Sequence, residues 1–259
     1  MRRGKGIAAR LAGWVLAGLL GVGSVAAQGL QPVDVELALV AGAHDLLTDD
    51  EIRIQRASYA MAIESPEVQA AIASGLHRRI AVLYMEWAGP ASQPVIVDWM
   101  VLEGPASTSA FAAALRRMPR VATGSGGLAP AVERAALLID SNAFAGRRRV
   151  IDLSGDGPNR AARDARTVRD RTIQRGITIN ALAVNRPGRS ELSGTALVRN
   201  YQQEVAGGWD SFVAMAPDRP SLPHAIRRKL VQEIGGPSFL QDLERRWGAR
   251  AWSALSGPR

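Results

Sequence analysis

The chain has 259 residues, of which 47% are hydrophobic and 22% are charged. This composition suits one globular domain with short appendages, and the length allows a full hydrophobic core. The absence of cysteine excludes disulfides and thiol chemistry. The formal charge is +8; residues 1–27 hold four positive charges and no acid, so the remainder carries +4. Because the other arginines mostly alternate with acids, and no aromatic residues interleave with a basic patch, we do not expect nucleic-acid binding.

Residues 1–27 have the pattern of a signal peptide. A basic start precedes an apolar run at 11–25, and Val25 and Ala27 provide small residues at the −3 and −1 positions of a signal-peptidase site. We therefore expect cleavage after Ala27 and a periplasmic or secreted protein. An uncleaved N-terminal anchor is the alternative. No later segment of the sequence is apolar over the length that a membrane span requires, so none is expected after cleavage.

The first elements of the mature chain are a strand and a helix. Residues 35–41 are mostly apolar and fit a central strand that is buried on both faces. Thr48, with Glu51 three residues later, forms a capping-box pattern and predicts a helix over 49–62. The side chains that recur at helical spacing there are Ile54, Ala57 and Met61.

The rest of the chain continues this alternation of strands and helices. Residues 80–87 and 95–101 are two strands joined by a short loop, so one of them pairs antiparallel. Further strands are expected at 150–153, 177–184 and 212–216, and further helices at 66–73, 106–117, from 128 onward, 159–175, 197–205, 220–234 and 238–255. This order predicts an α/β fold with a doubly wound, mostly parallel central sheet, one antiparallel edge strand and helices on both faces.

In such folds the binding site lies in the crevice at the carboxyl ends of the strands. Three loops meet that description: 42–47, 123–127 and 154–159. The third loop holds Asp156 between two glycines at the end of a buried strand, where a carboxylate projects into the crevice. The candidate crevice residues are Gly42, His44, Asp45, Thr123, Ser125, Ser154, Asp156 and Asn159.

The order of elements and several motifs resemble a von Willebrand factor type A (vWA) domain, and more closely a family of exported bacterial proteins with that fold. The motifs are VDVELALV, EIRIQRASYAMAI, IAVLYMEWAG, RRVIDLSGDGPN, GITINALAV and AIRRKLVQEIGG. The resemblance implies a vWA-like domain over 33–236, which follows a signal peptide at 1–27 and precedes a C-terminal helical extension at 237–259.

The resemblance also implies a metal-ion-dependent adhesion site, in which the first loop reads Asp-x-Ser-x-Ser, the second supplies threonine and the third aspartate. In this chain the first-loop positions fall on Gly42, His44 and Leu46, and the second-loop position falls near Gly126. Only the third-loop aspartate is retained, as Asp156. The possible substitute ligands are Thr123, Ser125 and Asp45. Because magnesium prefers a full shell of oxygens, we expect a degenerate, metal-free crevice without a cofactor, with bound magnesium as the alternative.

The function that this resemblance implies is an exported interaction module, not an enzyme, which binds an unidentified protein partner without a metal bridge. Two alternatives remain open from the residues. One is a periplasmic hydrolase in which Ser125 is the nucleophile and His44 and Asp156 form a catalytic pair. The other is a small-anion binder at the loop of residues 123–127, which precedes a helix N-terminus.

Overall fold

Six strands form a single sheet in the order β3-β2-β1-β4-β5-β6. The computed structural model describes residues 29–158, 162–186, 188, 192 and 194–254, except for the side chains of 162, 163 and 247–254. Strands β2 and β3 pair antiparallel and the other neighbours pair parallel, which confirms the predicted fold class. The expected signal peptide and Asn159 lie outside the described residues. The strands are β1 (Gln31–Gly42), β2 (Ile80–Trp87), β3 (Val95–Leu102), β4 (Phe144–Gly155), β5 (Ile177–Val184) and β6 (Val213–Ala216).

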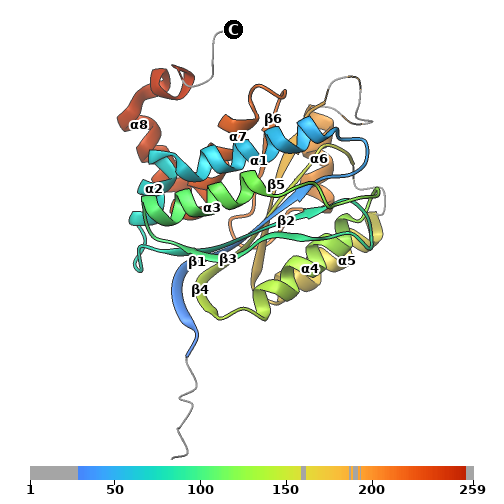
Figure 1. The fold of residues 1–259 in the computed structure, drawn as a ribbon, viewed down its shortest axis with the longest axis horizontal. Coiled ribbons are helices and arrows are strands. Elements are labelled where there is room, and N and C mark those ends of the chain that lie inside the picture. The colour runs from blue at the N-terminus through green and yellow to red at the C-terminus, as the bar shows by residue number, and fades with distance from the viewer. Residues whose placement is uncertain (1–28, 159–161, 187, 189–191, 193, 255–259) are drawn as a thin grey trace, which may run out of the picture.

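Helices cover both faces of the sheet (Figure 1). The helices are α1 (Asp49–Glu64), α2 (Pro66–Ala73), α3 (Pro105–Arg117), α4 (Leu128–Asp140), α5 (Ala162–Gln174), α6 (Thr195–Glu204), α7 (Leu222–Gly235) and α8 (Pro237–Ala254). Helices α1, α2, α3 and α7 bury apolar side chains against one face of the sheet, and α4, α5 and α6 against the other. Successive side chains along each central strand point alternately into these two cores. Because both faces are buried, the central strands are continuous apolar runs in the sequence.

Helix α1 has the predicted bounds within two residues, but the predicted core face is wrong. Ile54 and Met61 are 40% and 57% exposed, whereas Tyr59 is fully buried. The inward face also holds the polar residue Arg56, which donates two hydrogen bonds to the buried Glu86 carboxylate. The spacing of apolar residues does not identify the buried face of α1, because Arg56 lies on that face. Burial of Arg56 is possible because Glu86 neutralises its charge, and the sequence alone does not show this pairing.

Strand β4 begins six residues before the predicted range of 150–153. Its first half is rich in arginine and partly exposed, so its hydropathy is not that of a buried strand. It nevertheless pairs with β1 from the Gln31–Phe144 position onward. Backbone hydrogen bonds to β1 therefore extend β4 into a segment that side-chain hydropathy does not identify as a strand.

The crevice predicted at the carboxyl edge of the sheet lies between β1 and β4. The register places Ala41 beside Ser154, so the loops that follow these two strands start side by side. After β1 the chain continues to α1 on one face, and after β4 to α5 on the other. This is a topological switch point, the position at which open α/β sheets bind ligands.

Candidate functional site

The loop after β1 is held in place by one arginine. Arg120 donates hydrogen bonds to the carbonyl oxygens of Ala43, His44 and Leu47, at 3.2, 3.1 and 2.7 Å. The backbone N–H of Asp45 donates to the carbonyl of Gly124 at 2.9 Å. These bonds satisfy backbone carbonyls that a loop at the edge of the sheet would otherwise leave unpaired.

The loop after β4 brings Asp156 to His44. The His44 Nε2 atom lies 2.6 Å from Asp156 Oδ1, and the two side chains are 14% and 13% exposed. Tyr201 of α6 fixes the same loop, because its hydroxyl donates to the Gly157 carbonyl at 2.9 Å. A Cβ at Gly155 would overlap the buried Tyr201 hydroxyl, so a larger residue there would force Tyr201 to move.

Arg186, two residues after β5, occupies the other side of the Asp156 carboxylate. Its Nη1 donates to Asp156 Oδ2 at 2.6 Å, and its Nη2 donates to Glu51 Oε1 at 2.7 Å. Glu51 also completes the predicted capping box with Thr48, which is confirmed. The four residues His44, Asp156, Arg186 and Glu51 therefore form one continuous chain of hydrogen bonds and ion pairs, here called the crevice network.

The network sets the protonation states of its acids. Burial alone would raise the pKa of Asp156, but the hydrogen bonds and charges of His44 and Arg186 outweigh burial and lower it. The pKa of Glu51 is also lowered, because Thr48 and Arg186 outweigh its burial. Burial would lower the pKa of Arg186, but the two carboxylates raise it. Asp156, Glu51 and Arg186 are thus charged at neutral pH, and the two carboxylates are held by internal partners.

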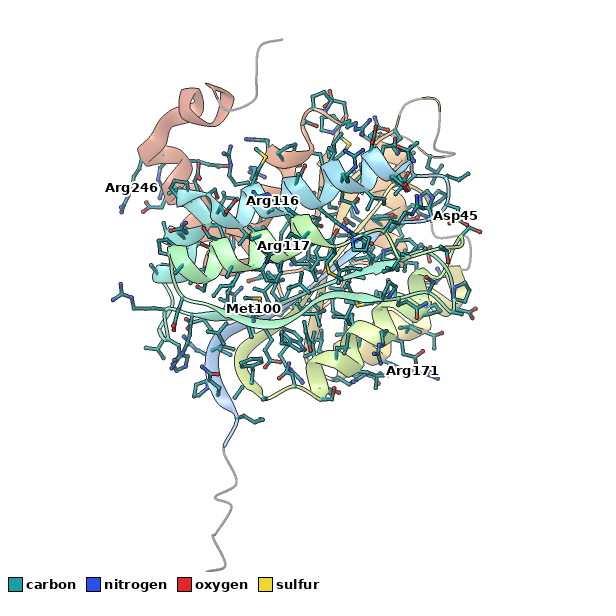
Figure 2. All side chains as sticks on the ribbon, in the orientation of Figure 1. Asp45, Met100, Arg116, Arg117, Arg171 and Arg246 are labelled. Atoms are coloured by element: carbon teal, nitrogen blue, oxygen red, sulfur yellow. The ribbon has the colours of Figure 1, made fainter. Side chains whose placement is uncertain are left out.

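The other candidate residues lie around this network without joining it. Ser154 is 1% exposed at the end of β4. The Asp45 side chain is 61% exposed, and its nearest cation is Arg120 at 3.7 Å. Figure 2 shows Asp45 at one end of the molecule, with Arg246 of α8 at the other. The side chains that hold the Asp156 carboxylate in the contacts described above are His44 and Arg186, and not the other candidates Gly42, Asp45, Thr123, Ser125 and Ser154.

The proposed hydrolase triad is only partly assembled. His44 and Asp156 are paired, as that hypothesis requires, but His44 Nδ1 is buried and has no hydrogen-bond partner among the described residues. Ser125 is exposed and does not reach either ring nitrogen. A serine nucleophile needs a base within hydrogen-bond reach, so the described geometry does not favour this activity.

The residues present do not form a shell that suits a magnesium ion. Both carboxylate oxygens of Asp156 have a hydrogen-bonded or ion-paired partner, and one of those partners is a cationic guanidinium. In the described part of the chain, no group of three or more His, Cys, Asp or Glu side chains is arranged to hold a metal ion. Magnesium requires near-octahedral oxygen ligands, which His44 and Arg186 do not supply.

Three residues that organise the crevice were not predicted from the sequence: Arg186, Arg120 and Tyr201. Arg186 follows the buried strand β5, and the end of β5 pairs with the end of β4. Its position two residues after a parallel strand could therefore have indicated a crevice residue. Tyr201 and Arg120 gave no comparable indication, because each acts on backbone atoms that are distant in sequence.

Replacing Arg186 with glutamine is expected to lower the free energy of unfolding by about 1.5–3 kcal/mol at pH 7, the range for hydrogen bonds to charged groups. The lowered pKa values of Asp156 and Glu51 mean that the stabilisation is fully present above pH 4–5 and is lost as the pH falls through the folded-state values. Urea unfolding at neutral pH and near pH 2 measures this difference, which should shrink strongly in acid. The control is Arg53→Gln, which breaks an exposed pair with Asp50 and should cost well under about 1 kcal/mol. An equal cost of Arg186→Gln at both pH values would contradict the assignment.

The fold defined by this sheet and crevice is that of a vWA domain. The open conformation of the pilus adhesin SpaC from Lactobacillus rhamnosus GG matches with a TM-score of 0.56 at 9% identity, over 80% of this chain and 31% of that chain. A von Willebrand factor type A protein from Catenulispora acidiphila matches with a TM-score of 0.53 at 14% identity, over 79% and 43%. Proximal thread matrix protein 1 from the mussel byssus matches with a TM-score of 0.51 at 12% identity, over 80% and 49%. The chain therefore spans less than half the length of these three proteins.

The chain belongs to the family described as "Protein of unknown function (DUF1194)", whose model matches residues 32–238. This is a vWA-like family, so the predicted family resemblance is confirmed. No curated protein matches the chain. Within its described part, no helix has both the length and the hydropathy of a membrane span.

Proposed function

We propose that this domain is an exported, non-enzymatic interaction module that binds a protein partner at the carboxyl edge of its sheet without a bridging metal ion. The observation that carries the proposal is the position of Arg186, whose guanidinium lies against the retained Asp156 and provides a positive charge within the crevice. Arg186 neutralises the Asp156 carboxylate in place of a bound metal ion. The fold supports the interaction class, because the pilus adhesin SpaC has the same fold.

The surface beside the crevice network has the mixed character of a protein-binding surface. Leu46, at the tip of the loop after β1, is 74% exposed. Val121, adjacent to the Arg120 that holds this loop, is 49% exposed. Asp45, the residue before Leu46, provides an exposed charge. An apolar anchor with a charged rim is the usual arrangement of protein–protein interfaces.

The test is capture of partners from an extract of cells that express the protein, with the immobilised chain in EDTA or in millimolar Mg²⁺. A partner should bind equally under both conditions, and Leu46→Asp should remove it. Leu76→Asp is the matched control, because Leu76 is 72% exposed but precedes β2 at the opposite edge of the sheet. The melting temperature of the chain should also be the same in EDTA and Mg²⁺, since a ligand that binds the folded state stabilises it.

Two results would refute parts of this proposal. Capture that requires Mg²⁺, together with stabilisation by Mg²⁺ that Asp156→Ala abolishes, would show that the crevice binds a metal. Capture that survives Leu46→Asp would move the binding surface away from the carboxyl edge.

A further inference from the structure

The amino edge of the sheet, where the parallel strands begin, carries most of the strongly exposed apolar side chains. The four most exposed large hydrophobic residues of the described chain, at 82, 74, 72 and 58%, are Trp209, Leu46, Leu76 and Leu30. Leu46 belongs to the carboxyl edge, but the other three lie at the amino edge. Leu30 directly precedes β1, Leu76 lies in the turn before β2, and Trp209 lies beside the start of β5. Exposed apolar side chains on one side of a domain mark an interaction surface.

The turns that carry Leu76 and Trp209 are fixed to the sheet. The backbone N–H of His77 donates to both carboxylate oxygens of Asp34, at 3.0 Å each, and Asp34 belongs to β1. The carbonyl of Trp209 accepts a hydrogen bond from Thr178 Oγ1 at 3.1 Å. Because their backbones are held in this way, both apolar side chains are presented to solvent by ordered turns.

The same edge carries an excess of positive charge. Asp140 neutralises part of it, because its carboxylate accepts from Arg149 Nη1 at 2.9 Å and from Arg175 Nε at 2.8 Å. Arg78 and Arg147 are exposed and have no ion pair in the described chain. The connections at this edge hold seven arginines and three acids, counted over residues 74–79, 103–104, 140–149, 171–176 and 207–212.

The other acids near this edge are buried. Asp34 and Glu36 of β1 are 7% and 2% exposed, and N–H groups of the chain bind both carboxylates. The loop and first helical turn at the carboxyl edge, residues 43–51, have the opposite charge, with four acids and no arginine or lysine. The charge of the domain is therefore polarised, and its amino edge is the basic end.

The apolar run at 11–25 joins the domain at the amino edge. Leu30 follows Val25 by five residues, and an extended chain spans at most about 3.6 Å per residue, so the two lie within about 18 Å of each other. A membrane that holds this run, during the export that we expect or through a retained anchor, is therefore next to the amino edge. The 12-residue strand β1 then leads to the carboxyl edge, away from that membrane.

We propose that the amino edge docks on the surface of an anionic phospholipid membrane. Arg78 and Arg147 bind lipid phosphates, while Trp209 and Leu76 enter the headgroup region. Arginine is attracted to anionic lipid, and an indole is favoured where a bilayer meets water. This orientation leaves the carboxyl edge free for a protein partner, but the proposal does not depend on the function proposed for that edge.

The test is co-sedimentation of the chain from Gln28 onward with lipid vesicles. Both cores of the fold lie within this part of the chain, which lacks the apolar run that would itself enter a bilayer. Vesicles that contain phosphatidylglycerol should bind the chain at least about tenfold more tightly than vesicles of phosphatidylcholine alone. Sodium chloride at about 0.5 M should weaken this binding, because salt screens the arginines from the lipid.

Variants at the amino edge separate the apolar contribution from the charge. Trp209→Ser and Leu76→Ser should each weaken binding to the anionic vesicles by about fivefold or more, since binding scales with buried apolar area. The double variant Arg78→Gln/Arg147→Gln should also weaken it by about fivefold or more. All four side chains are exposed, so these variants are expected to keep the melting temperature of the parent chain.

The matched controls are Leu46→Ser, at a residue as exposed as Leu76, and the double variant Arg117→Gln/Arg219→Gln. Arg117 ends α3 and Arg219 follows β6; both are exposed without an ion pair in the described chain. This control has the same net charge as the double variant at the amino edge, and both controls should bind as the parent does.

Three results would overturn the proposal. The first is absence of binding, or equal binding to the two kinds of vesicle. The second is equal weakening by the two double variants, which would show that net charge and not the amino edge is responsible. The third is weakening by the arginine substitutions but not by Trp209→Ser or Leu76→Ser, which would assign this edge to a soluble polyanion.

Discussion

Replacing Lys229 with methionine is expected to lower the free energy of unfolding by about 3–5 kcal/mol, the cost of leaving a buried charge without its partner. Lys229 projects from α7 and is 1% exposed. Its Nζ lies 2.7 Å from Asp152 Oδ1 and also contacts the Glu233 carboxylate. Asp152 is itself 1% exposed, so without Lys229 its charge has neither water nor a cation near it.

The measurement is urea unfolding of Lys229→Met, of Asp152→Asn and of the double variant. The double variant should recover most of the stability that Lys229→Met loses, because it removes the stranded carboxylate together with the ammonium group. The coupling energy from this double-mutant cycle isolates the pair. If the two costs simply add, Asp152 and Lys229 do not stabilise each other, and the assignment of the buried pair is wrong.

Replacing Gly127 with alanine is expected to lower the free energy of unfolding by about 2–4 kcal/mol, the sum of a left-handed backbone penalty and an overpacking penalty. Gly127 has a φ of 86° and precedes the first residue of α4. A Cβ at this position would lie 2.5 Å from the carbonyl carbon of Gly89 and 2.8 Å from the Pro90 nitrogen. These are backbone atoms and cannot move aside as the end of a side chain can.

The neighbouring Gly126 provides the matched control for this prediction. Its φ of 79° is also left-handed, but a Cβ there would meet nothing within 4 Å. Gly126→Ala should therefore cost only the backbone penalty, about 1 kcal/mol. The difference between the two variants in urea unfolding measures the close approach of the two loops. Equal costs would show that the loop of residues 123–127 is not packed against Gly89.

The contact at Gly127 bears on the third candidate function, a small-anion site in this loop. Gly124 also approaches Gly89, so the loop lies against the turn between β2 and β3. The exposed residues Thr123 and Ser125 remain on its outer side. The structure therefore uses these glycines for close packing between loops, a role that explains them without a bound phosphate.

The sequence predicted two residues of the crevice, Asp156 and His44, but not their partner Arg186. Asp156 and His44 each follow a recognisable buried strand, and the fold places the ends of those strands side by side. Their pairing over 112 positions was expected only under the hydrolase alternative, as a catalytic pair. Arg186 lies 30 positions from Asp156 in a loop without a motif, so nothing local connected the two residues.

The sequence by itself determined the fold class, because apolar runs of strand length alternate with helical segments and only a few topologies satisfy that order. It also determined the position of Asp156, since a carboxylate between glycines after a buried strand has one place in such a fold. Only the tertiary structure decided the partners of the charged residues. Asp152 is buried against Lys229 of α7, and Asp156 is held by Arg186. Ion pairs depend on distances of a few ångströms between elements far apart in the chain, and local patterns do not encode those distances.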